Sequence, residues 1–230
     1  MSSLLRPWEK YFTVVMWDQR YAGKTFARNG EESCRGLSID GVAGDGIALA
    51  NYLRGRLHQT KIILLGHSWG TMVGLRMVHD RPDLFSAFVG TGFAVSIAEK
   101  EPVNYARAMA PLRGAHMEDG IRALQNIGPP PWTSPDAVMV EREWSERIDV
   151  PAERDIYANM TPLVLFAPHW SLWDDYEYLQ AGRFANEATF AAGNSYDARK
   201  LGAKYKLPFF IFNGELDNIT PRAFSDQNAS

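Results

Sequence analysis

The hydrophobic positions along the chain fall into two patterns that alternate through its first part. Short and nearly continuous apolar runs, rich in β-branched and aromatic residues, occupy 11–17, 61–65 and 84–90, and each predicts a buried strand. Residues 38–57 and 71–79 instead carry apolar side chains at helical spacing. Strands and helices that alternate at short spacing form right-handed βαβ units, so we expect a mostly parallel sheet covered by helices.

The pattern changes after about residue 94. Residues 95–201 have helical periodicity, are rich in Trp, Tyr, Arg and Glu, and are broken by prolines. Residues 206–212 then return to the pattern of a buried strand. We therefore expect three parts in chain order: the first part of an α/β core over 1–94, a helical insertion over 95–201, and the last strand of the core with its following turn over 202–230.

Composition narrows the class of protein. The 230 residues are 46% hydrophobic and 22% charged, as in soluble globular proteins. A net charge of −3 gives no electrostatic basis for binding nucleic acid or a membrane surface, and no apolar run is long enough to span a bilayer. Residues 1–10 lack a secretory signal, and the single cysteine, Cys34, excludes an internal disulfide. We expect a cytoplasmic protein without a cofactor or metal; the sequence leaves its oligomeric state open.

One stretch joins a predicted strand to a predicted helix through a chemically informative motif. Residues 66–70, Gly-His-Ser-Trp-Gly, fit the pattern G-x-S-x-G of a nucleophile elbow, in which a strained turn lifts the Ser68 hydroxyl clear of the sheet. We expect Gly66 and Gly70 to avoid collisions with neighbouring backbone, and Gly74 to let the helix lie close to the strand. The alternative is an ordinary turn with Ser68 as a helix N-cap, which gives no reason for the flanking glycines.

Gly23-Lys24-Thr25 raises a different hypothesis, a P-loop that binds a nucleotide through Lys24. That motif requires a glycine five positions before Gly23 and a helix after the threonine. Asp18 stands at the glycine position, and residues 26–33 are typical of a polar loop. A nucleotide site is therefore the weaker hypothesis.

Four motifs along the chain resemble those of one enzyme family. They are Asp-Gln-Arg at 18–20, G-x-S-x-G around Ser68, three prolines at 129–131 and Gly-x-x-Asp at 214–217. In this order they resemble the α/β-hydrolase superfamily, and within it the proline iminopeptidase-type serine hydrolases, over nearly the whole chain. Tyr21 departs from that pattern, because a glycine usually follows the arginine. The resemblance implies an α/β-hydrolase fold with a helical cap, and a small-molecule or short-peptide substrate cleaved at a peptide, amide or ester bond.

The resemblance also implies roles for individual residues. The family order of serine, acid and histidine makes Ser68 the nucleophile and Asp217 the acid. The position of Asp217 in a turn after a strand agrees independently, with an Asx-turn residue as the alternative. The backbone N–H of Trp69 is expected to supply half of the oxyanion hole. Acidic cap residues hold the substrate amine in the family's aminopeptidases, and the candidates here are Asp174, Asp175 and Glu177. The alternative is that these three residues form a solvated helix face.

Two parts of this machinery have no counterpart in the sequence. No histidine follows Asp217, and residues 1–10 contain no glycine for the family's Gly-rich oxyanion loop. We therefore expect a fold that is incomplete at both ends, and an inactive fragment or pseudoenzyme is the alternative to an active hydrolase. Of the five histidines only His169 is expected to reach the pocket. His67 is expected to point into the fold, and the others to lie too far away: His58, His79 and His116.

Overall fold

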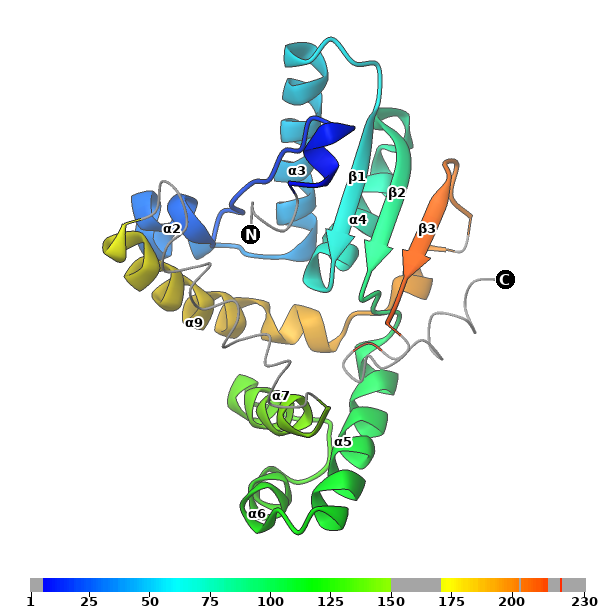
Figure 1. Cartoon of the computed structure of the whole chain (residues 1–230). Coiled ribbons are helices and arrows are strands. Elements are labelled where there is room, and N and C mark those ends of the chain that lie inside the picture. Colours follow the sequence, from blue (N-terminus) through cyan, green and yellow to red (C-terminus); the bar gives the residue numbers. More distant parts are fainter. Residues whose placement is uncertain (1–5, 150–170, 203, 215–219, 221–230) are drawn as a thin grey trace. The chain divides into compact units, whose positions relative to one another are not determined.

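The computed structural model describes residues 6–149, 171–202, 204–214 and 220 (Figure 1). These residues belong to two compact units. One contains the described residues up to Leu37 and the first part of the last long helix, through Ala188. The other contains Ser38–Asp149 and the described residues from Thr189 onward. The units group residues by proximity, so their limits differ from the predicted limits at 94 and 201.

The amino-terminal unit corrects two expectations. Residues 11–17 form no strand, and Tyr11 is 81% exposed. A strand is stabilised by pairing with a neighbour, and no described strand pairs with this apolar run. Residues 26–33, expected to form a polar loop, lie instead in two helices, α2 (Gly23–Asn29) and the 3₁₀-helix η2 (Gly30–Cys34). This unit also includes η1 (Trp8–Lys10) and the start of α9 (Leu172–Asn194).

The sheet of the second unit has three described strands, in the order β1 (Ile62–His67), β2 (Phe85–Thr91) and β3 (Phe209–Phe212). Both pairs of neighbours are parallel, and Leu65, Val89 and Phe210 lie side by side in register. The predicted parallel sheet is confirmed. Because the three strands run in the same direction, their carboxyl ends lie at the same edge of the sheet.

One helix, α4 (Trp69–Asp80), packs on a face of this sheet, and α3 (Ile39–Arg56) packs against α4 (Figure 1). α3 begins at Ser38, whose hydroxyl accepts a hydrogen bond of 3.0 Å from the Gly41 N–H, as a predicted N-cap should. α4 lies against β1 and β2 and is followed by the 3₁₀-helix η3 (Pro82–Leu84). A β-carbon on Gly74 would lie 2.5 Å from the Phe88 ring, so the expected close approach of helix and sheet is confirmed.

The opposite face of the sheet differs sharply in exposure. On the face toward the helices, Phe85 and Phe88 are completely buried. On the other face, four side chains of β1 and β3 are 41–61% exposed. The exposed set is apolar: Ile63, Leu65, Phe210 and Phe212. Within the described residues, the sheet therefore buries one face only.

The predicted helical block contains α5 (Ile97–Gly114), α6 (Glu118–Ile127), α7 (Pro135–Asp149) and α9, with the 3₁₀-helix η5 (Ala198–Leu201) after it. The first three of these helices pack together around a small apolar core. Its buried members are Ala108, Met109, Leu112 and Leu124. α5 continues through Pro102 and Pro111, so these two prolines do not break the helix as the sequence pattern suggested.

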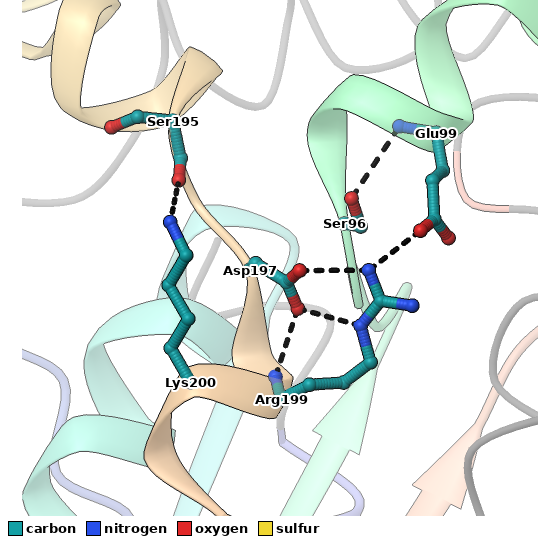
Figure 2. A network of polar contacts seen from close by, with 6 residues as sticks. All are labelled: Ser96, Glu99, Ser195, Asp197, Arg199 and Lys200. Carbon is teal, nitrogen blue, oxygen red and sulfur yellow. Dashed lines mark hydrogen bonds and ion pairs between the residues drawn. The ribbon is translucent and has the colours of Figure 1, made fainter.

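The chain enters and leaves this block at adjacent points, where residues 95–97 run antiparallel to residues 196–198. Figure 2 shows the polar side chains around this point. The backbone contacts are Ala198 N–H to Val95 C=O at 2.7 Å and Ile97 N–H to Tyr196 C=O at 3.2 Å. Arg199 adds exposed ion pairs with Glu99 at 2.6 Å and Asp197 at 2.7 Å. The same network holds the start of α5, because the Ser96 hydroxyl accepts from the Glu99 N–H.

Candidate active site

Ser68 lies alone between the last residue of β1 and the first residue of α4. Its φ is 50° and its ψ is −116°, a conformation that side-chain-bearing residues rarely adopt. Its hydroxyl makes no capping hydrogen bond to α4, and the residue is exposed. The strained turn predicted for a nucleophile elbow is therefore present, and the alternative of a plain N-cap is wrong.

The surrounding backbone holds Ser68 in this conformation. Its N–H donates to the Thr91 carbonyl at the end of β2, at 3.0 Å. Its own carbonyl accepts from both the backbone N–H and the hydroxyl of Thr71, at 2.8 and 2.6 Å. Thr71 is completely buried. The peptide groups on both sides of the serine are thus fixed, which leaves the side chain as the exposed part of the turn.

The two glycines of the motif have different roles. A β-carbon on Gly66 would lie 2.4 Å from the Gly70 carbonyl oxygen and 2.7 Å from its carbon, so a side chain at Gly66 is excluded. A β-carbon on Gly70 would meet no atom within 4 Å. The expected collision is confirmed for Gly66 and wrong for Gly70, because the crowding is between the Gly66 side-chain direction and the Gly70 carbonyl.

Trp69 is the first residue of α4 and directly follows Ser68. Its N–H therefore belongs to the positive end of the helix dipole, where a negative charge is stabilised. Its role as the predicted oxyanion-hole donor stays a prediction.

His67, next to the nucleophile, does not point into the fold as expected. The residue is exposed, and its Nδ1 lies 2.9 Å from the Thr91 hydroxyl. The ring also borders Gly92, where a β-carbon would lie 3.2 Å from its Cε1. Gly92 has a φ of +56°, so the backbone conformation and the neighbouring ring both favour glycine there.

The other histidines do not reach the elbow within the described residues. His58 follows α3 and precedes β1, at the end of that strand opposite to Ser68. His79 lies near the end of α4 with its Nδ1 2.9 Å from Asp80. His116 lies between α5 and α6. His169 lies outside the described residues.

The predicted acid, Asp217, also lies outside the described residues. Asn213 directly follows β3, and its side-chain oxygen accepts from the Phe93 N–H at 2.8 Å. The Asn213 amide nitrogen donates to the Thr220 carbonyl at 3.0 Å. Sequence reasoning missed this residue, and its only sequence signal is an amide side chain directly after a buried strand.

Of the three acidic residues predicted to hold an amine, only Asp174 has a described side chain. The Asp174 carboxylate accepts from the Ser171 N–H and hydroxyl, both at 2.7 Å, and the Ser171 hydroxyl accepts from the Asp174 N–H at 3.2 Å. These hydrogen bonds lower the pKa of Asp174 and form a reciprocal cap at the start of α9. The side chains of Asp175 and Glu177 lie outside the described part. Binding of an amine stays a prediction.

At Gly23-Lys24-Thr25, the segment considered for a nucleotide site, the Asp18 carboxylate lies where a bound phosphate would be expected. The Asp18 carboxylate accepts from the Lys24 N–H at 3.0 Å, and the Asp18 carbonyl accepts from the Thr25 hydroxyl at 2.8 Å. A β-carbon on Gly23 would lie 2.4–2.6 Å from that carboxylate. The start of α2 is thus occupied by the protein's own carboxylate, which argues against a phosphate cradle.

A second polar cluster, which the sequence did not reveal, is buried between α5 and α7. Arg142 pairs with Glu101 at 2.6 Å and with Glu141 at 2.8 Å, and the Ser145 hydroxyl donates to Glu141 at 2.6 Å. Lys100 lies 3.4 Å from Glu101. Burial lowers the pKa of Lys100 to about 8 and raises the pKa of Glu141.

Neither a metal centre nor a membrane span is found within the described residues. His, Cys, Asp and Glu side chains form no group there that is suited to hold a metal ion. None of the described helices combines the length and the hydrophobicity that crossing a bilayer requires.

Comparison with known proteins agrees with this geometry. Residues 2–230 match the family model of the alpha/beta hydrolase fold. The chain belongs to this family. The match confirms the predicted fold class and identifies an enzyme of the hydrolase type.

Individual relatives of this α/β hydrolase are distant. "Probable aminopeptidase YbaC" of Bacillus subtilis (strain 168) is 25% identical over 224 residues, which are 95% of this chain and 69% of the relative. Among solved structures, VinJ is 16% identical with a TM-score of 0.57, over 97% of this chain and 71% of VinJ. NosK from Streptomyces actuosus is 17% identical with a TM-score of 0.47, over 99% of this chain and 74% of NosK. The likeness to VinJ concerns the fold.

Proposed function

We propose that this α/β hydrolase is a serine hydrolase that cleaves a peptide, amide or ester bond by acyl transfer. The observation that carries the proposal is the backbone of Ser68, strained at φ 50° between β1 and α4 with an exposed side chain. Strain at a single side-chain-bearing residue, held by hydrogen bonds on both sides, is typical of a position where the reaction requires that geometry.

In the proposed reaction the Ser68 oxygen attacks the substrate carbonyl and forms a tetrahedral intermediate. The Trp69 N–H stabilises its negative oxygen. A histidine accepts the serine proton and returns it to the leaving amine or alcohol, and Asp217 orients that histidine. His169 is the candidate for this base, because none of the other four histidines is placed to act as one. Water then attacks the acyl-enzyme and releases the acid, which restores the Ser68 hydroxyl.

The finer proposal is an aminopeptidase that resembles proline iminopeptidases. It is supported by Asp-Gln-Arg at 18–20, by the elbow sequence at 66–70, and by the distant likeness to the aminopeptidase-named relative. Such an enzyme must recognise the free amine of its substrate, for which Asp175 and Glu177 remain candidates beside the capping residue Asp174. Acylation of the substrate's free amine should then abolish its cleavage.

The test is labelling of the purified chain with a fluorophosphonate probe, with Ser68→Ala as the inactive comparison. Labelling lost in this variant supports an activated serine. The same preparations are then assayed with prolyl and alanyl p-nitroanilides, their N-acetyl forms, and p-nitrophenyl acetate. Cleavage that requires the free amine supports the aminopeptidase, and cleavage of esters alone supports an esterase. A folded chain that neither labels nor cleaves any of these would favour the pseudoenzyme instead.

A further inference from the structure

Two hydrogen-bonded peptide groups flank the α-carbon of Ser68. The Ser68 N–H belongs to the peptide group before it and donates to the Thr91 carbonyl at the end of β2, at 3.0 Å. The Ser68 carbonyl belongs to the peptide group after it and accepts from the N–H and the hydroxyl of Thr71, at 2.8 and 2.6 Å. The angles φ and ψ are the rotations of these two planar groups about the α-carbon. Holding both groups therefore holds φ at 50° and ψ at −116°.

Thr71, the third residue of α4, supplies both donors to this carbonyl. Its N–H makes the kind of backbone contact that is usual in the first turn of a helix, and a carbonyl oxygen has a second lone pair to offer. The hydroxyl takes that second lone pair. Because Thr71 is completely buried, bulk water has no access to the hydroxyl, and its branched β-carbon restricts the side chain to few rotamers. Two donors that converge on one oxygen fix the direction of the carbonyl more firmly than one.

The same carbonyl determines where the next N–H points. The Ser68–Trp69 peptide group is planar and trans, so its C=O and its N–H point in opposite directions. The carbonyl points along α4 toward Thr71, and the Trp69 N–H therefore points away from the body of the helix. That N–H is the predicted oxyanion-hole donor, and such a donor is effective only when it is aimed at the oxygen that becomes negative.

We propose that Thr71 is a positioning residue, because its buried hydroxyl fixes the Ser68–Trp69 peptide group and thereby aims both the Ser68 side chain and the Trp69 N–H. The inference rests on the proposed function. A hydroxyl bonded to the carbonyl three positions earlier is common in helices, and Ser33 makes that contact with Gly30 at 2.7 Å. In the nucleophile turn the carbonyl belongs to the strained residue, so the contact holds a conformation that a free chain rarely adopts.

Two substitutions separate the hydroxyl from the packing of the side chain. Thr71→Val removes the hydroxyl and keeps the branched shape, whereas Thr71→Ser keeps the hydroxyl and removes a methyl group. We expect kcat to fall by about 5- to 30-fold in Thr71→Val, with KM changed less than about threefold, because alignment in the transition state is lost. The rate of fluorophosphonate labelling should fall by a similar factor. Wild-type rates in Thr71→Val would overturn the proposal.

The conservative variant distinguishes positioning from packing. Thr71→Ser should keep both rates near those of wild type, and a fall as large as that in Thr71→Val would assign the effect to packing and overturn the proposal. Thr71→Ala provides a second comparison, because Ala and Ser at this position differ by the same hydroxyl. Equal rates in Thr71→Ala and Thr71→Ser would overturn the proposal even if Thr71→Val did not fold.

The matched control is Ser33→Ala, which removes the hydroxyl from a contact of the same kind in η2. Ser33 is partly buried, and its hydroxyl bonds to a carbonyl that does not belong to the nucleophile turn. The kcat and the labelling rate of this variant should stay at their wild-type values. Losses as large as those in Thr71→Val would show that general destabilisation explains the effect, and would overturn the proposal.

A measurement that needs no activity separates failure of this inference from failure of the proposed function. Loosening the Ser68 carbonyl should lower the protection of the residue 68 and 71 amides from hydrogen exchange in Thr71→Val, and not in Thr71→Ser. Wild-type protection in folded Thr71→Val overturns the positioning role whether or not the protein is a serine hydrolase. A wild-type chain that neither labels nor cleaves, while Thr71→Val loses protection, overturns the proposed function and the positioning role, and the fixed peptide group stands.

Discussion

The α-carbon of Gly66 faces the carbonyl group of Gly70 so closely that a β-carbon on Gly66 would lie 2.4 Å from the carbonyl oxygen. The contact spans the nucleophile turn, with Gly66 at the end of β1 and Gly70 in the first turn of α4. The turn can therefore be this compact only because Gly66 carries a hydrogen in place of a side chain.

This relationship predicts opposite results for two similar substitutions. Gly66→Ala should lower the free energy of unfolding by about 1–3 kcal/mol, because strand and helix must move apart. Gly70→Ala should leave it unchanged or raise it by up to about 1 kcal/mol, because the position is open and alanine favours helix. Urea denaturation of both variants tests the pair. Equal destabilisation by the two substitutions would contradict the one-sided crowding.

The contact between α4 and the sheet gives a second prediction. A β-carbon on Gly74 would lie 2.5 Å from Cε2 of Phe88, which is completely buried. Gly74→Ala should therefore cost about 1–3 kcal/mol despite the better helix propensity of alanine. Phe88→Leu creates space at the same place, so the double variant should be more stable than the sum of the single losses predicts. Strict additivity in thermal and urea denaturation would exclude this contact as the cause.

The buried cluster between α5 and α7 predicts unequal roles for two arginines of α7. Arg142→Met would leave the Glu141 carboxylate buried without its paired cation and Glu101 with Lys100 alone, and we expect a loss of about 3–5 kcal/mol. Arg147 pairs with Glu143 at 2.7 Å, but both side chains are more than half exposed, so Arg147→Met should cost less than about 1 kcal/mol. Chemical denaturation at neutral pH measures both, and similar losses would argue against burial as the reason.

Lys100 predicts a dependence of stability on pH. Burial lowers its pKa to about 8 from the ordinary 10.5, so between these values the unfolded chain binds more protons than the folded chain. The free energy of unfolding contributed by Lys100 therefore rises with pH from about 8 to 10.5 and is constant below that window. The difference between wild type and Lys100→Met should grow by about 2 kcal/mol from pH 7 to pH 9.5. A constant difference across this range would contradict the lowered pKa.

Much of the fold could be predicted from local patterns. The helix after Ser38, with its serine cap, and the three strands of the sheet follow from periodicity and capping residues within a few positions of each other. The elbow also has a local signature, because the strain at Ser68 is built from a strand end, a glycine and a helix start. Local patterns misjudged residues 11–17, since an apolar run becomes a strand only when another strand pairs with it.

Only the tertiary structure decided the contacts between residues that are far apart in sequence. Asn213 reaches the Phe93 N–H across 120 positions, and Arg142 reaches Glu101 across 41. Neither Asn213 nor Glu101 has a distinctive local pattern, because an amide after a strand or a charge on a helix is usually solvated. The sequence by itself determined most of the described helices and strands, and the place of the nucleophile turn, through short-range periodicity and glycine geometry. The folded chain decided which polar groups are buried together, since that depends on packing between segments that no local pattern relates.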